Sequence, residues 1–117
     1  MRAWQSGEKA GRSGLRLVTL PVPAPGRGEL LVKVGAAALN YADLLMIDDR
    51  YQIKPPRPFT PGQEIAGHVV TAGPGARLAP GTVIASKVIW GGFADYALVR
   101  DDMAMTVPDG FGLAEAA

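Results

Sequence analysis

The chain has 117 residues, the size of one domain that buries a hydrophobic core of its own. Twelve basic and eleven acidic residues give a net charge of +1 without a long cluster of either sign, so we expect no nucleic-acid partner. Cysteine is absent, which excludes disulfides, thiolate nucleophiles and every cysteine-based zinc site, and there is a single histidine.

The N-terminal segment, MRAWQSGEKAGRSG, lacks the apolar core of a signal peptide. No later apolar stretch approaches the ~18 residues that a membrane span requires. We therefore expect a cytoplasmic protein that makes no membrane contact.

Short segments rich in β-branched and apolar residues alternate with Gly/Pro turns along the chain. The expected strands are Arg2–Gln5, Leu15–Leu20, Glu29–Leu39, Glu64–Ala72, Thr82–Ile89, Phe93–Arg100 and Met103–Val107. In the third segment Leu30, Val32 and Val34 share one face, which is typical of a half-buried strand. Short strands with frequent turns predict a mainly β fold, either a sandwich or a barrel.

One short helix is expected at Tyr41–Asp48, directly after the third strand. Asn40 is a favoured N-cap residue, and Asp43 at position N3 can reach back to it in a variant of the capping box. The same polar residues could serve only as a cap or could also border a site. A second helical segment, Phe111–Ala117, has less than two turns, and we expect a domain boundary there.

Two loops differ in what they predict. Four prolines between Tyr51 and Gly62 exclude a helix or central strand, and a stiff loop of this length is often functional. The glycines of Gly73–Gly81 lack the third glycine and the following helix of a dinucleotide fingerprint. No βαβ unit occurs elsewhere, so tight dinucleotide binding by this chain alone is not expected.

Several motifs occur in a familiar order: N-Y-A-D from Asn40, P-G-Q-E-I-A-G-H-V-V from Pro61, G-T-V-I-A from Gly81 and G-G-F-A-D-Y-A-L-V from Gly91. Together they resemble the medium-chain dehydrogenase/reductase superfamily. More narrowly, residues 1–117 resemble the N-terminal GroES-like catalytic domain of its zinc-independent, zeta-crystallin-like quinone oxidoreductases. The resemblance implies a mainly β, GroES-like, partly open β-barrel with one or two short helices. It also implies a Rossmann domain, absent from the chain and expected after residue 117.

The resemblance places Asn40 and Gln63 where zinc alcohol dehydrogenases of the superfamily have a cysteine and a histidine ligand. Amide side chains are poor zinc ligands beside thiolate and imidazole, so no zinc is expected. Ala42 stands where those enzymes carry the hydroxyl of their proton relay. Alcohol oxidation is therefore not expected.

The resemblance also implies roles for individual residues. Asn40 and Tyr51 are predicted to be catalytic, with Asn40 beside the nicotinamide together with Tyr41. The predicted substrate-binding residues are Asp43, Leu45 and Gln63.

The predicted function is that of the substrate-side domain of an NADPH-dependent reductase of small-molecule quinones or other α,β-unsaturated carbonyls. NADPH would be bound mainly by the missing domain, and the full-length protein could be a homodimer. The alternatives are an enoyl or alkenal reductase of the same superfamily, and a free-standing GroES-like barrel that acts as a binding or assembly module.

Other conspicuous side chains have simpler interpretations. We expect Glu64 to be a hydrogen-bonded partner of nearby backbone or arginine, and His68 to be structural. Asp101 and Asp102 are expected in a solvated turn. Trp4 and Trp90 are expected in the core or an interface.

Overall fold

The computed structural model describes all 117 residues and contains seven strands and two short α-helices. The strands are β1 (Arg2–Ser6), β2 (Leu15–Thr19), β3 (Glu29–Ala38), β4 (Glu64–Ala72), β5 (Val83–Lys87), β6 (Tyr96–Arg100) and β7 (Ala104–Thr106). The helices are α1 (Tyr41–Ile47) and α2 (Leu113–Ala116), and the 3-10 turns are η1 (Arg12–Gly14) and η2 (Asp101–Met103). Every expected strand and both helical segments are confirmed, with ends that differ by up to three residues.

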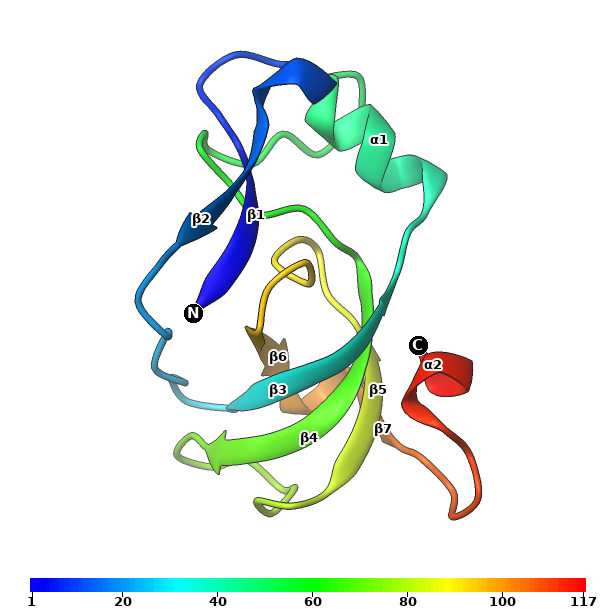
Figure 1. The fold of residues 1–117 in the computed structure, drawn as a ribbon. Coiled ribbons are helices and arrows are strands. Elements are labelled where there is room, and N and C mark those ends of the chain that lie inside the picture. Colours follow the sequence, from blue (N-terminus) through cyan, green and yellow to red (C-terminus); the bar gives the residue numbers. More distant parts are fainter.

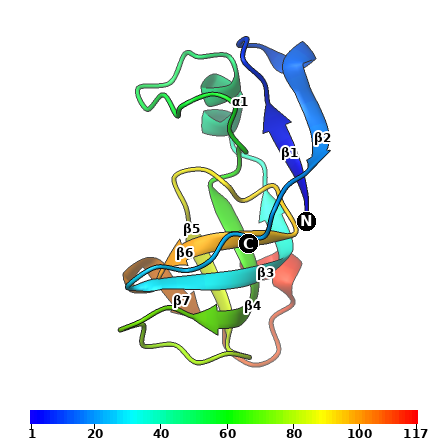
Figure 2. The ribbon, with the colours of Figure 1, turned by 90° about the vertical axis from the view of Figure 1, so that its left-hand side faces the viewer.

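The strands form two antiparallel sheets that do not close on each other. One is the β1–β2 ribbon, and the other has the order β6-β3-β4-β5-β7. Figures 1 and 2 show α1 at the end of the molecule opposite the five-stranded sheet, and α2 beside that sheet. The expected mainly β, partly open barrel is therefore confirmed.

The core lies on the five-stranded sheet. It consists of Leu30, Val32, Ile65, Val69, Ile84, Ala97 and Val99. Burial of these apolar side chains is the main stabilising contribution to the sheet. The close approach of β3 and β4 requires Gly67, because a Cβ there would overlap the Lys33 carbonyl oxygen.

The segment before β6 is a loop, although the sequence predicts that the strand begins there. Phe93 N–H donates to Pro61 O at 2.9 Å, and Asp95 N–H donates to Arg2 O at 2.9 Å. These bonds direct the backbone of residues 93–95 toward β1 and the proline-rich segment. The strand therefore begins only at Tyr96.

The Tyr51–Gly62 loop has no helix or regular strand, as predicted. Its residue Phe59 forms an isolated antiparallel bridge with Ser6 of β1, with N–H to O distances of 2.8 and 3.1 Å. Phe59 is buried. The loop thus connects the β1–β2 ribbon to the rest of the domain.

The expected solvated turn at residues 101–102 is wrong for Asp101, which is buried. Its carboxylate accepts the backbone N–H groups of Arg77 at 2.9 Å and Leu78 at 3.2 Å, and Arg77 Nε at 2.9 Å. These donors, above all the Arg77 N–H, hold the pKa of Asp101 below its ordinary value. Asp101 thereby joins the turn between β4 and β5 to the end of β6, whereas Asp102 is exposed.

The longer helix, α1, has only seven residues. No helix of the structure has the length and apolar character to cross a membrane.

Candidate functional site

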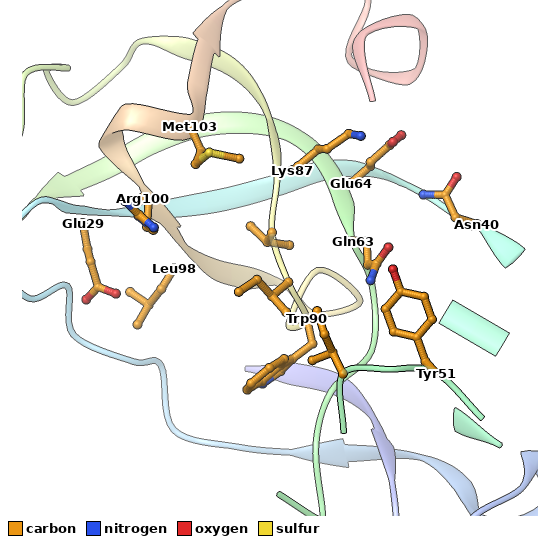
Figure 3. Close-up of a pocket in the computed structure, with 13 residues that line it drawn as sticks. Glu29, Asn40, Tyr51, Gln63, Glu64, Lys87, Trp90, Leu98, Arg100 and Met103 are labelled. Carbon is orange, nitrogen blue, oxygen red and sulfur yellow. The ribbon is translucent and has the colours of Figure 1, made fainter. Parts of the chain in front are cut away.

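A cavity of about 690 Å³ lies against the ends of several strands of the five-stranded sheet (Figure 3). It is lined by Glu29, Asn40, Tyr51, Ile53, Gln63, Glu64, Lys87, Val88, Ile89, Trp90, Leu98, Arg100 and Met103. These residues come from segments that are far apart in the sequence, so the cavity exists only in the folded chain.

Three uncharged polar side chains of the predicted site lie together on this wall: Asn40, Tyr51 and Gln63. Asn40 precedes α1, Tyr51 begins the proline-rich loop, and Gln63 lies between that loop and β4. Amide N–H and phenol O–H groups can donate hydrogen bonds to a carbonyl oxygen. The arrangement can therefore orient and polarise a carbonyl compound without a formal charge.

The N-terminus of α1 explains why the Asn40 amide is available. Asp43, the N3 residue of α1, makes one half of a capping box, because its Oδ2 accepts the Asn40 backbone N–H at 2.8 Å. Asp43 N–H in turn donates to the Asn40 backbone carbonyl at 3.0 Å. The Asn40 side chain itself makes no capping hydrogen bond, so its amide remains free on the cavity wall.

Asp43, predicted to bind substrate, lies behind this wall with no exposed surface. Its Oδ1 atom has no hydrogen-bond partner. Burial raises the pKa of the Asp43 carboxyl, and the Asn40 N–H acts in the opposite direction. The position of Asp43 fits a group that holds Asn40 in place.

Tyr41 and Leu45, predicted for the cofactor and substrate sides, are not among the cavity-lining residues. Tyr41 is 74% exposed, whereas Leu45 is half-buried in α1. The structure thus brings three of the six predicted site residues together and leaves the other three off the wall. The roles of all six stay predictions.

Six apolar residues form much of the rest of the wall: Ile53, Val88, Ile89, Trp90, Leu98 and Met103. Trp90 is 38% exposed and Trp4 is 45% exposed, so neither tryptophan lies in the core, and the interface alternative stays a prediction. An apolar wall that faces a few polar groups is the usual composition of a small-molecule site.

The cavity wall also contains four charged residues, for which the sequence predicted no ligand-binding role: Glu29, Glu64, Lys87 and Arg100. Arg100 donates to Asp102 at 2.6 Å, and Glu29 accepts the Gly26 N–H at 2.8 Å. Glu64 and Lys87 are direct partners across β4 and β5, but neither side chain makes a hydrogen bond or an ion pair. The expectation of a bonded Glu64 is therefore wrong, and Glu64 instead lines the cavity together with Lys87 (Figure 3).

The cavity also joins the two positions that the resemblance matched to zinc ligands, Asn40 and Gln63, with Glu64 beside them. Two amides and one carboxylate are a poor donor set for catalytic zinc, which favours thiolate and imidazole. The single histidine, His68, is exposed on β4 and does not line the cavity.

The open antiparallel barrel, with its cavity beside the start of α1, agrees with the class that the sequence resembles, the GroES-like domain of medium-chain dehydrogenases/reductases. Residues 26–109 match the family "Alcohol dehydrogenase GroES-like domain". The chain belongs to this family.

Two relatives illustrate the similarity in sequence. Trans-enoyl reductase FMN2 of Fusarium mangiferae is 44% identical over 98 residues, which cover 83% of this chain and 26% of that protein. Quinone oxidoreductase of Homo sapiens is 33% identical over 112 residues, which cover 93% of this chain and 34% of that protein. The chain therefore spans only about a quarter to a third of the length of these relatives.

Two solved structures illustrate the similarity in fold. Quinone oxidoreductase from Thermus thermophilus, also solved in complex with NADPH, is 34% identical with a TM-score of 0.83 over 99% of this chain and 35% of that chain. A cobalt- and zinc-bound alcohol dehydrogenase from Pyrobaculum aerophilum is 27% identical with a TM-score of 0.89 over 99% of this chain and 43% of that chain. A metal-bound enzyme therefore shares this fold, so the metal content of this chain must be judged from its own donor side chains.

Proposed function

We propose that the chain is the substrate-side catalytic domain of a zinc-independent, NADPH-dependent reductase of quinones or other α,β-unsaturated carbonyls. The observation that carries the proposal is the cavity, in which Asn40, Tyr51 and Gln63 meet an apolar wall. Such a wall suits a flat conjugated ring, and the polar end suits its carbonyl oxygen. The proposal is supported by relatives and solved structures named as quinone oxidoreductases.

In this proposal the chain's own residues bind and polarise the acceptor. NADPH, when bound to the full-length protein, supplies hydride to the electron-poor carbon. Asn40 and Tyr51 donate hydrogen bonds to the oxygen on which negative charge develops, and these bonds strengthen as the charge grows. Trp90 and its apolar neighbours exclude water from the ring of the acceptor.

The chain has no glycine-rich strand–turn–helix unit, so the proposal requires a Rossmann domain elsewhere in the full-length protein. We place that domain after residue 117. Pairing of two full-length copies through it is part of the same proposal.

The proposal is tested with the full-length protein and a panel of quinones and enones, with NADPH oxidation as the measurement. We expect turnover that a chelator does not reduce, and a loss of about 10²-fold or more in kcat/KM for Asn40→Ala. Oxidation of simple alcohols that a chelator abolishes would contradict the zinc-independent assignment. Absence of both turnover and ligand binding would favour the alternative of a non-catalytic GroES-like module.

Enoyl substrates are the second candidate. The 44% identity to a trans-enoyl reductase, higher than that to the human quinone oxidoreductase, favours them. Crotonyl thioesters and 1,4-naphthoquinone, compared at equal concentration with the same enzyme, distinguish the two by kcat/KM.

A further inference from the structure

Arg57 lies in the middle of the Tyr51–Gly62 loop and donates four hydrogen bonds to two other parts of the chain. One terminal nitrogen donates to Ser6 Oγ at 2.7 Å and to Gly7 O at 3.0 Å, at the end of β1. The other donates to Ile47 O at 2.8 Å and to Met46 O at 3.4 Å, at the end of α1. One guanidinium group therefore connects three segments.

The positive charge of Arg57 also lies at the C-terminal end of α1. The last turn of α1 contains no basic residue, and Asp48 and Asp49 follow it, although the C-terminal end of a helix favours positive charge. Arg57 has no acidic partner of its own and adds its donors to two carbonyl groups of this end, Met46 O and Ile47 O, which also accept the N–H groups of Asp49 and Gly11. It thus acts as a C-cap supplied by a distant loop.

Both elements that Arg57 joins carry residues of the cavity wall. Asn40 immediately precedes α1, and Tyr51 and Ile53 lie on the first part of the loop. Within the loop, the guanidinium carbon of Arg57 also lies 5.2 Å from the centroid of the Phe59 ring. Arg57 itself does not line the cavity.

We infer that Arg57 is a positioning residue, which fixes α1 and the Tyr51–Gly62 loop relative to each other and so sets the spacing of Asn40 and Tyr51 across the cavity. The expected effect on ligand binding rests on the proposed function. The expected effect on the positions of α1 and the loop does not. Lysine cannot replace Arg57, since one ammonium group cannot reach both sets of acceptors as a planar guanidinium does.

The test compares Arg57→Lys and Arg57→Met with the parent chain by hydrogen exchange and by quinone binding. Both measurements use a Trp4→Phe background, so that quenching of Trp90 by 1,4-naphthoquinone reports the cavity. We expect exchange in residues 41–62 to rise about tenfold while β3 and β4 stay protected, and the Kd for the quinone to rise about tenfold. Should Arg57→Met fail to fold, the charge-conserving lysine variant carries the test.

Val69→Ala is the matched control, because it removes core methyl groups from β4 without touching α1, the loop or the cavity wall. It should lower the Tm yet leave both the exchange of residues 41–62 and the Kd at parental values. Unchanged exchange in Arg57→Lys overturns the inference, and so does faster exchange with an unchanged Kd. If neither the parent chain nor the full-length protein binds a quinone, the proposed function fails, while the exchange result still decides whether Arg57 holds the two elements.

Discussion

Gly62 gives a sharp test of the packing next to the site, through the substitution Gly62→Ala. Its φ is +112°, a conformation that side-chain-bearing residues rarely adopt. A Cβ at this position would lie 2.7 Å from Phe93 N and 2.9 Å from Gly92 C, both backbone atoms. Gly81 is the natural control, because its φ is +90° but a Cβ there meets no atom within 4 Å.

The two glycines separate conformational strain from steric overlap. Strain at a positive φ is worth about 1–3 kcal/mol and should appear in both alanine variants. Overlap adds about 1–3 kcal/mol at Gly62 alone, since the backbone of residues 92–93 must move. It must also stretch the bonds from Gly92 N–H to Gly62 O and from Phe93 N–H to Pro61 O, now 3.1 and 2.9 Å.

Thermal denaturation followed by circular dichroism measures the difference. For a domain of this size, 1 kcal/mol changes the Tm by about 4 °C, so Gly62→Ala should melt about 4–12 °C below Gly81→Ala. Its quinone affinity should also fall, because Gln63 is the next residue and lies on the cavity wall. Equal Tm values for the two variants would refute the close contact on which the reasoning depends.

Three further predictions concern charged residues. Because the pKa of Asp101 is lowered in the folded state, its carboxylate stabilises the fold above the ordinary pKa of 3.8, and this stabilisation is lost as the pH falls through the folded-state pKa. Asp101→Asn should therefore make the free energy of unfolding in urea fall less steeply between pH 5 and pH 3 than it does in the parent chain. An unchanged slope contradicts this. Asp43→Ala should lower the free energy of unfolding by about 1–2 kcal/mol through loss of the α1 cap, with Asp43→Asn restoring most of it, as measured by urea denaturation. Lys87→Met should remove the salt dependence of the Kd for a sulfonated naphthoquinone and leave the Kd for a neutral naphthoquinone within about twofold of the parental value. An equal loss of affinity for both compounds would show that the charge of Lys87 does not act on the ligand.

Features encoded within a few residues could be predicted from the sequence. Glycine and proline turns marked every strand, and the pair Asn40 and Asp43 marked the start of α1. The resemblance brought Asn40, Tyr51 and Gln63 into one site, and they do line one cavity. In each case the evidence lay in neighbouring residues or in a known pattern.

Features that depend on distant partners could not be predicted. The sequence around Asp101 is typical of a surface turn, and its donors at Arg77 and Leu78 are distant in the sequence. Glu64 and Lys87 face each other only because of the β4–β5 register, which no local pattern specifies. Arg57 reaches Ser6 across 51 positions of sequence, and nothing around Arg57 indicates that partner.

The cap of α1 depends on the carboxylate at residue 43 and on the backbone of residue 40, not on the side chain of residue 40. The start of α1 therefore does not depend on the kind of side chain at residue 40, and either a thiolate or an amide at this position would leave the helix unchanged. Residue 40, one of the two positions matched to zinc ligands, can thus carry either a metal ligand or a hydrogen-bond donor without loss of this helix start.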